Sequence, residues 1–428
     1  MSDVVRVGLL GCGTVGSAVV RLLVEHADEI ALRAGCRVEV VRVAVRDRSK
    51  ARDIPLPDEC FTEDAEALVV DPDVDVVCEL IGGVEPAKEL LLAALESGKP
   101  VVTGNKELLA SRGWELFDLA DAKGLDLYFE AAVGGGIPLI RPLKESLAGE
   151  RVRRVLGIVN GTTNYILSRM SDDGMSFDDA LVEAQRLGYA EADPTADVGG
   201  HDAAAKCAIL ASIAFDARVT ASDVHTEGIS RVSKQDIEIA RRLGYVVKLL
   251  AIAELDGDAI AVRVHPAMVP ADHPLASVRG SFNAVFVEGE KSGELMFYGR
   301  GAGGDPTAVA VVGDLATVAR HLHSGGRGPV FTRIVQRAVS PIERNDDQYY
   351  LLLEVVDRPG VLAEIAAVLG RNNVSIRSVW QEGTGEDAQL VFVTHRAREE
   401  HFRTAVRELD TSPVVKEVRS ILRVEGEE

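Results

Sequence analysis

Asp202 and Lys206 form an isolated acid–base pair, because no other charged side chain lies between Asp202 and Asp216 of the 428-residue sequence. The alanine, isoleucine and leucine residues around them predict a helix from about Gly200, and residues four apart share one helix face. A surface helix is polar over its outer face, so this apolar helix is expected to be buried on nearly all sides. A surface salt bridge is the alternative interpretation, but buried charges often mark chemistry. The stretch predicts an enzyme site that uses a lysine.

Three carboxylates precede this helix, at Glu191, Asp193 and Asp197 of the predicted loop 189–199. With Asp202 near the helix N-terminus, they are expected to attract a cation, and an amino group on a small substrate fits. These residues alone predict no particular reaction.

A glycine-rich turn near the N-terminus has the spacing of a dinucleotide-binding motif. The apolar run 4–10 predicts a strand before the turn, and residues 18–24 predict a helix after it. The glycines allow a tight turn and let the backbone approach a pyrophosphate at the helix N-terminus. The turn consists of Gly11, Cys12, Gly13, Thr14, Val15 and Gly16.

The residues at the end of the second predicted strand, 38–45, bear on whether the cofactor is NADP(H) or NAD(H). An acidic residue there would bind a ribose 2′-hydroxyl, but the next residue is Arg46, followed by Asp47 and Arg48. The arginines favour a 2′-phosphate and therefore NADP(H) over NAD(H), while Asp47 leaves the choice open. A solvated charged loop is the alternative.

Further strands are predicted at 74–80, 100–103 and 125–130, with helices at 86–97 and after Lys106. This alternation is typical of a parallel sheet with crossover helices, whose ligands bind at the carboxyl ends of the strands. Lys106 follows such an end and is a second candidate for the active site, although a lysine also commonly begins a helix.

The pattern changes at the glycine-rich segment 131–138, which either acts as a hinge or offers backbone carbonyls to a monovalent cation. Beyond it, a strand at 152–159, a helix at 161–170 and alternating runs predict a second, α+β domain. The runs lie at 259–264, 283–288 and 294–298. A helix at 306–321 is expected to return to the first domain.

The C-terminal residues predict the order βαββαβ of a ferredoxin-like domain. Its strands are expected at 349–356, 374–380, 389–394 and 414–423, and its helices at 360–370 and 399–409. The turn at 357–360 carries no nucleophile or acid–base cluster, so binding fits this domain better than catalysis.

The composition excludes several classes of protein. A formal net charge of −20, without a basic stripe, argues against nucleic-acid binding. The sequence has no signal-peptide pattern and no run of about 18 apolar residues, so a cytoplasmic protein without a membrane span is expected. Five scattered cysteines without a CxxC motif predict reduced thiols, with neither a disulfide framework nor a zinc site.

Six stretches give the chain a resemblance to homoserine dehydrogenase over its whole length, and the C-terminal DRPGVLAEIA resembles an ACT domain. The six are GLLGCGTVG at 8–16, GGVEP at 82–86, VVTGNK at 101–106, EAAVGGGIP at 130–138, GIVNGTTN at 157–164 and GYAEADPTADVGGHDAAAK at 188–206. Gly104 departs from the alanine usual in the family, which is not expected to abolish the chemistry of the neighbouring lysine.

The resemblance implies an α/β protein with a Rossmann-type parallel sheet, a second α+β domain for substrate binding and dimerisation, and a C-terminal ferredoxin-like ACT domain. The expected boundaries are 1–130 for the NAD(P)-binding domain and 131–300 for the substrate domain. Residues 301–322 form the returning helix, 323–346 a linker, and 347–428 the ACT domain.

The implied activity is the reversible NAD(P)H-dependent reduction of L-aspartate 4-semialdehyde to L-homoserine, on the pathway to threonine, methionine and isoleucine. The resemblance assigns proton transfer to Lys206 and a place near the reacting carbon, the substrate and the cofactor to Lys106. It places Glu191 and Asp202 on the substrate. Arg46, Thr103 and Gly303 join the glycine turn in the expected cofactor site.

The resemblance also implies a sodium ion held mainly by backbone carbonyls, with a carboxylate nearby. The residues concerned are Glu130, Val133, Gly135 and Ile137. A feedback effector, expected to be threonine, and a homodimer or homotetramer complete the expectation.

Two other functions fit parts of the pattern. Another semialdehyde or amino-acid dehydrogenase would share the glycine turn and the lysines, but not the 160–164 stretch together with Glu191, Asp202 and Lys206. A regulator that senses nucleotides and amino acids would need the Rossmann-like and ACT modules, but no catalytic lysine.

Overall fold

A computed structural model describes residues 4–329, 337–383, 385 and 388–426. The chain forms two compact units, and each is described by itself. The first contains residues 1–159, 205–224 and 282–337, and the second contains 160–204, 225–281 and 338–428. Residues of the expected substrate domain, 131–300, therefore contribute to both units. No helix within the described part of the chain is both long and apolar enough to span a bilayer.

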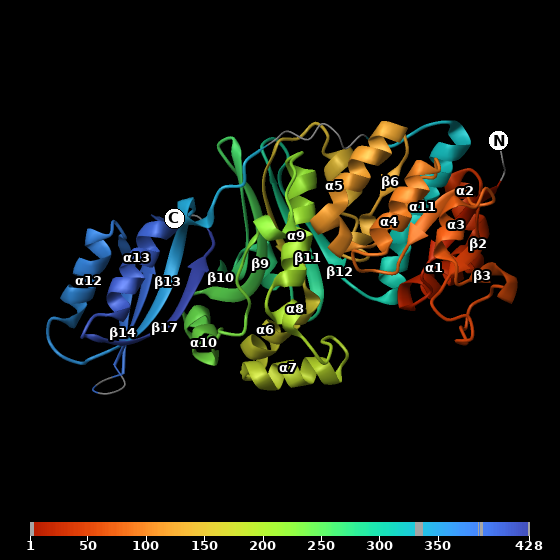
Figure 1. The fold of residues 1–428 in the computed structure, drawn as a ribbon. Coiled ribbons are helices and arrows are strands. Elements are labelled where there is room, and N and C mark those ends of the chain that lie inside the picture. The colour runs from red at the N-terminus through yellow and green to blue at the C-terminus, as the bar shows by residue number, and fades with distance from the viewer. Residues whose placement is uncertain (1–3, 330–336, 384, 386–387, 427–428) are drawn as a thin grey trace. The chain divides into compact units, whose positions relative to one another are not determined.

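The first unit contains a parallel six-stranded sheet in the order β3-β2-β1-β4-β5-β6, which confirms the predicted Rossmann-type fold (Figure 1). The order reverses between β1 and β4, which is where ligands bind in such sheets. The two-residue strand β3 was not predicted. The strands are β1 (Val4–Leu10), β2 (Arg37–Ala44), β3 (Phe61–Thr62), β4 (Val76–Glu79), β5 (Val101–Thr103) and β6 (Leu127–Tyr128).

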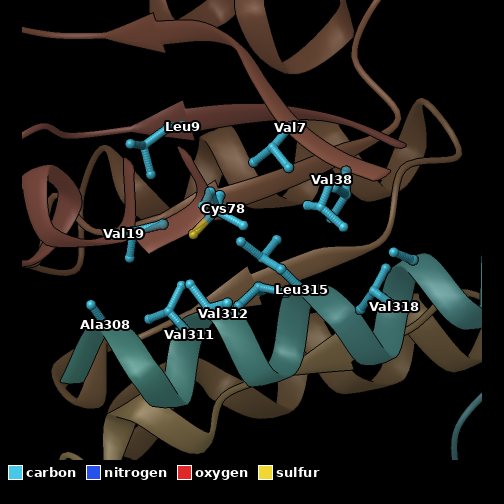
Figure 2. Packing of buried hydrophobic residues seen from close by; sticks show 14 of the residues in the cluster. Val7, Leu9, Val19, Val38, Cys78, Ala308, Val311, Val312, Leu315 and Val318 are labelled. Carbon is cyan, nitrogen blue, oxygen red and sulfur yellow. The ribbon is translucent and has the colours of Figure 1, made fainter. Parts of the chain in front are cut away.

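Helices pack around this sheet, and one of them comes from much later in the sequence. Figure 2 shows this helix, α11, with Val311, Leu315 and Val318 facing Val7 and Cys78 of the sheet. Burial of these apolar side chains fixes the late segment onto the sheet. The helices are α1 (Thr14–Glu25), α2 (Ala27–Ala34), α3 (Ala65–Val70), α4 (Ala87–Glu96), α5 (Lys106–Lys123) and α11 (Gly304–Ser324).

The same unit also holds three antiparallel strands in the order β12-β11-β7. They are β7 (Val152–Ile158), β11 (Phe282–Gly289) and β12 (Gly293–Arg300), and the prediction had placed strands at each of them.

The second unit begins with helices and a long hairpin. β9 is not among the predicted strands, because its residues 247–253 are all buried, Lys248 included, and show no alternation of apolar and polar side chains. It pairs antiparallel with β10 along the whole length of both strands. The elements are α6 (Gly161–Asp173), α7 (Phe177–Arg186), α8 (Thr195–Val198), β8 (His225–Thr226), α10 (Lys234–Arg242), β9 (Tyr245–Asp256) and β10 (Ala259–Pro270).

Helix α9 (His201–Ala214) carries Asp202 and Lys206. Residues 203–211 are all buried, as the apolar sequence predicted. Asp202 itself is partly exposed.

The βαββαβ domain is confirmed in the second unit, with its sheet in the order β17-β13-β15-β14. β17 also pairs in parallel with β10 through Arg423 and Val424, so the ACT sheet continues into the β9–β10 hairpin. The domain comprises β13 (Asp346–Val355), α12 (Val361–Arg371), β14 (Ile376–Glu382), β15 (Gln389–Thr394), β16 (Ala397–Arg398), α13 (Glu399–Asp410) and β17 (Val415–Val424).

The expected linker, 323–346, is described only in part, because 330–336 lie outside the described residues. Its last part is structured: Ile260 of β10 donates its N–H to Ala338 and accepts one from Ser340, at 2.9 and 2.8 Å. The segment that leads into the ACT domain is thus held along the edge of β10.

A buried ionic cluster lies where β17 meets β10. The guanidinium of Arg423, whose side chain is 4% exposed, lies 2.9 Å from Glu399 and 3.1 Å from Glu227. Burial alone would raise the pKa of Glu399, but Arg423 and Arg403 beside it, together with the Tyr349 hydroxyl, lower it below its usual value. These four charged residues, Arg423, Glu227, Glu399 and Arg403, are called the Arg423 cluster below.

Candidate active site

A cavity of about 230 Å³ lies at the carboxyl ends of β4 and β5 in the first unit. It brings together Lys106 and Lys206, one hundred positions apart in the sequence, with glycine-rich backbone from several loops. The other lining residues are Gly82, Gly83, Gly104, Asn105, Glu107, Ala131, Ala132, Gly134, Gly135, Gly301, Ala302 and Thr307. Both predicted lysines therefore line one cavity at the expected edge of the sheet.

The two lysines are positioned by different means. Lys206 is 8% exposed, and its Nζ donates to the carbonyl oxygen of Val159 at 2.7 Å. Lys106 is the first residue of α5, whose N-terminus is capped by Asn105, because Oδ1 of Asn105 accepts from the N–H of Leu108 at 3.1 Å. Rigid helices thus carry both ammonium groups to the cavity.

Asn160, for which the sequence gave no separate role, organises the predicted carboxylates of the second unit. Its Nδ2 donates to Asp197 at 2.7 Å and to Asp202 at 2.9 Å. Its Oδ1 accepts from the N–H of Thr163 at 2.8 Å and caps α6. A buried side-chain amide therefore holds two carboxylates together, and no charge pattern in the sequence reveals this role.

The other two loop carboxylates do not join this group. Oδ1 of Asp193 accepts from the hydroxyl and the N–H of Thr195, at 2.6 and 3.1 Å, and these bonds lower the pKa of Asp193. Asp193 thus forms a local turn just before α8, a helical turn within the segment predicted as a loop. Glu191 is exposed. Of the three loop carboxylates, Asp197 therefore shares the amide of Asn160 with Asp202, whereas Asp193 bonds to its own loop.

The glycine turn has the geometry that a dinucleotide requires. Gly11 has φ +94°, and a Cβ on Gly16 would lie 2.3 Å from the carbonyl oxygen of Gly11. A Cβ on Gly13, by contrast, would meet no atom within 4 Å, so open space lies beside the turn. The first turn of α1 contains no acidic residue that would repel a phosphate. The turn therefore fits a pyrophosphate.

The remaining residues of the turn lie beside another predicted cofactor residue. Cys12 and Val15 are partly buried, and Cys12 Sγ lies 3.5 Å from Ser17 Oγ. Gly303 has φ +127°, and a Cβ on the next residue, Gly304, would lie 3.0 Å from the methyl group of Thr14. The backbone that begins α11 thus packs against the first turn of α1.

Two further predicted cofactor residues lie at strand ends with different surroundings. Arg46 is exposed, two residues beyond β2. Thr103 is fully buried at the end of β5, and its hydroxyl donates to Glu79 at 2.5 Å. Arg46 is accessible to a ligand through its side chain, while the Thr103 hydroxyl is engaged within the protein.

Glu130 and the glycine-rich segment after it form a backbone-rich turn. The Glu130 carboxylate accepts the N–H groups of Leu139, Ile140 and Arg141, the latter two at 2.7 and 3.0 Å. Gly135 has φ +56°, and a Cβ there would lie 2.6 Å from Gly301. Val133 and Ile137 flank this turn and are buried. The carboxylate therefore binds the backbone amides of the segment that follows the turn.

Asp314 on α11 is fully buried beside Glu130, and it accepts the backbone N–H of Glu130 at 2.8 Å. Burial and the Glu130 carboxylate raise the pKa of Asp314 from 3.8 to about 8, although Arg141 at 3.5 Å opposes this. The folded protein therefore retains a proton that the unfolded chain releases near pH 4. Stability from this group is complete below that pH and is lost as the pH rises toward 8.

We expect Asp314→Asn to remove this pH dependence, because asparagine stays neutral and still accepts the Glu130 N–H. In urea unfolding between pH 4 and 8, the variant should lack a slope of up to about 1.4 kcal/mol per pH unit that the unmodified protein shows. Equal slopes in both proteins would contradict the assignment.

Three family models match successive parts of the chain. The family model described as "Homoserine dehydrogenase, NAD binding domain" matches residues 11–130, "Homoserine dehydrogenase" matches 138–316, and "ACT domain" matches 349–413. The homoserine dehydrogenase of Corynebacterium glutamicum is 52% identical over 98% of this chain and 96% of its own. That of Bacillus subtilis is 45% identical over 99% and 98%.

Solved structures with homoserine dehydrogenase in their names are also similar to this chain. The crystal structure of a homoserine dehydrogenase from Thiobacillus denitrificans has a TM-score of 0.93 and 43% identity, covering 99% of this chain and 98% of its own. A putative homoserine dehydrogenase from Archaeoglobus fulgidus has a TM-score of 0.66 and 33% identity, covering 74% of this chain and 99% of its own. The chain, with its NAD-binding sheet, its lysine-lined cavity and its C-terminal ACT domain, belongs to the homoserine dehydrogenase family.

Proposed function

We propose that the protein catalyses the reversible NAD(P)H-dependent reduction of L-aspartate 4-semialdehyde to L-homoserine, in the biosynthesis of threonine, methionine and isoleucine. The observation that carries the proposal is the pair Lys106 and Lys206 on one cavity at the carboxyl ends of the parallel strands. A regulator that only senses ligands would not need two ammonium groups there.

Hydride transfer to or from the substrate carbon is the chemistry that the nicotinamide cofactor supplies when bound. Reduction of an aldehyde leaves an alkoxide, and Lys206 donates the proton that it takes up; in the reverse direction Lys206 accepts that proton. Lys106 orients the substrate and the cofactor near the reacting carbon. Asp202 and Glu191 bind the polar ends of the substrate, with Asp202 at its ammonium group.

The supporting geometry is that Lys206 and Asp202 each have a fixed partner. Lys206 is held by the Val159 carbonyl, and Asp202 by the amide of Asn160. Such preorganisation reduces the reorganisation that the reaction would otherwise require.

An absorbance assay at the NAD(P)H band tests the function. The full-length protein is given homoserine with NADP, and separately with NAD, and the reverse reaction is followed from the semialdehyde. Turnover of homoserine, with no turnover of serine or glutamate semialdehyde as controls, is the expected result. Absence of turnover with either cofactor would contradict the proposal.

We infer a preference for NADP(H) from Arg46, which is exposed beyond β2. A relative that supports it is a hyperthermophilic archaeal homoserine dehydrogenase, 28% identical with a TM-score of 0.62, which was solved in complex with NADPH. Arg46→Ala should raise KM for NADPH about tenfold or more, because one charge-assisted bond to the 2′-phosphate is lost, and leave KM for NADH nearly unchanged.

Arg42→Ala is the matched control for this variant. The guanidinium of Arg42, on β2 itself, donates to the carbonyl oxygen of Glu59 at 3.0 Å, so its loss should change neither KM by more than a small factor. Equal KM changes for NADPH and NADH in Arg46→Ala would refute the assigned role.

We propose that the ACT domain binds threonine and inhibits the enzyme. The Archaeoglobus fulgidus relative covers only 74% of this chain, which supports a catalytic part that folds without the C-terminal residues. Truncation after Arg327 should therefore retain turnover within a few-fold and lose inhibition by threonine. Methionine and isoleucine serve as control effectors, and a full-length enzyme that ignores all three at millimolar concentration would contradict this regulation.

A sodium ion on the carbonyls of Val133, Gly135 and Ile137 and a homodimer or homotetramer complete the proposal. Carbonyl oxygens are suitable ligands for a hard monovalent cation. The Glu130 carboxylate binds the amides of Ile140 and Arg141, just beyond that turn.

A further inference from the structure

Glu79 is a fully buried carboxylate at the carboxyl end of β4. In the sheet order, β4 lies beside β1, where the order reverses, and Glu79 pairs with Leu10 on one side and Thr103 on the other. This is the position where ligands bind in open parallel sheets. A buried carboxylate is costly unless it is hydrogen-bonded, so its partners indicate what it does.

The partners of Glu79 belong to two separate loops. Its Oε1 accepts the N–H groups of Ile81 and Gly82 at 2.8 and 3.0 Å, in the loop that follows β4. Its Oε2 accepts the hydroxyl of Thr103 at 2.5 Å, at the start of the loop that follows β5. One side chain therefore joins the two loops.

The second loop links Glu79 to Lys106 through Thr103 and Asn105. The Thr103 hydroxyl oxygen accepts the N–H of Asn105 at 3.0 Å, and Asn105 caps the helix that Lys106 begins. Nδ2 of Asn105 donates back to the carbonyl oxygen of Gly83 at 2.6 Å. The bonds form a closed loop of contacts that includes Glu79, Thr103, Asn105 and the Gly82–Gly83 backbone.

Both loops line the cavity, because Gly82, Gly83, Asn105 and Lys106 are among its lining residues. Glu79 is not among them. We propose that Glu79 is a positioning residue that sets the distance between these two loops and thereby places Lys106 for the substrate and the cofactor. The inference rests on the proposed function, and it adds a residue outside the cavity that fixes the cavity's geometry.

The proposal predicts how variants of Glu79 rank in activity, because the role depends on the length of the side chain and on its acceptor atoms. Glu79→Gln keeps the length, and its carbonyl oxygen still accepts from Ile81 and Gly82 while its amide donates to Thr103. Glu79→Asp is one methylene too short to span both loops, and Glu79→Ala removes the link. Displacement of a catalytic group by about 1 Å reduces rate on the order of 10²-fold.

Asp75 is the matched control, because it stands at the amino end of the same strand. It also accepts three bonds, from the N–H, Nε and Nη2 of Arg6, at 2.8, 3.1 and 3.0 Å. Asp75→Asn perturbs the strand without touching either loop. Any effect that reflects only weakened folding should therefore appear in this variant too.

The experiment measures kcat and KM with homoserine, and, independently of turnover, Kd for NADPH by its fluorescence on the full-length protein. We expect Glu79→Gln and Asp75→Asn to stay within about threefold of the unmodified protein in kcat and Kd, corresponding to less than about 1 kcal/mol. Glu79→Asp and Glu79→Ala should lose kcat on the order of 10²-fold and bind NADPH at least several-fold more weakly.

Two outcomes would overturn the proposal: near-normal kcat and Kd in folded Glu79→Asp, or a loss in Glu79→Gln as large as that in Glu79→Asp, since the length of the side chain would then not account for the effect. Glu79→Asp serves in place of Glu79→Ala if the alanine variant does not fold. If the unmodified protein does not oxidise homoserine, the proposed function fails, while the ranking of Kd for NADPH still tests Glu79.

Discussion

Lys206→Ala is expected to lose kcat by about 10²–10⁴-fold, the range for removal of one positioned proton donor. The lysine lies on a buried helix and faces the cavity, so no solvent-exposed side chain replaces it readily. Kd for NADPH should change little, because the glycine turn that fits the pyrophosphate does not involve this residue. Steady-state kinetics together with NADPH fluorescence titration separate the two effects.

Lys99→Met is the control for loss of a buried lysine. Lys99 is also buried in the first unit, and its Nζ donates to the carbonyl oxygens of Asp71 and Val74, both at 2.8 Å. It does not line the cavity. Stability should fall in this variant while kcat stays near normal. Near-normal turnover in Lys206→Ala would remove Lys206 from the reaction, and an equal loss of kcat in both variants would assign the effect to folding.

Arg423→Met should reduce the free energy of unfolding of the second unit by about 3–5 kcal/mol, the range for breaking a buried ion pair from one side. Glu399, whose side chain is 4% exposed, loses its closest buried cation, at 2.9 Å. Glu227 is 38% exposed and can be hydrated, so it contributes less to the loss.

Arg419→Met on the same strand is the matched control. Arg419 is 46% exposed and pairs with Glu354 and Glu417, so its removal should cost at most about 1 kcal/mol. The sequence contains two tryptophans, and a Trp114→Phe background leaves Trp380 on β14 as the fluorescent reporter of urea unfolding. Equal shifts for Arg419→Met and Arg423→Met would mean that burial of the Arg423 cluster has no energetic consequence.

The elements with clear periodicity were predictable from the sequence. β1 was predicted at its observed bounds, and β15 likewise, because each is a β-branched run between turn residues. β9 was not, because its residues are buried on both faces and show no alternation. β3 is two residues long and depends on pairing with β2, which local sequence does not encode.

Some residues of the candidate site were likewise predictable from the sequence, and others were not. Lys106 and Lys206 could be found because a charged residue in an apolar or glycine-rich setting is conspicuous, and the structure brings both to one cavity. Glu79 and Asn160 could not, because much of their bonding is to backbone amides or to side chains of segments distant in the sequence. Asp193 could not be told apart from Asp197 in the sequence, because the folded chain decides whether a carboxylate two residues before a threonine bonds locally.

Because β17 pairs in parallel with β10, the ACT domain is joined to the rest of its unit by a shared sheet and not only by the connecting chain. Neighbouring strands of a hydrogen-bonded sheet share their twist, so a strand cannot rotate without its neighbour following. If a bound amino acid changed the twist of the ACT strands, β10 would therefore be twisted with them. The size of the change in β10 would depend on the stiffness of the shared sheet and not on the length of the connecting chain.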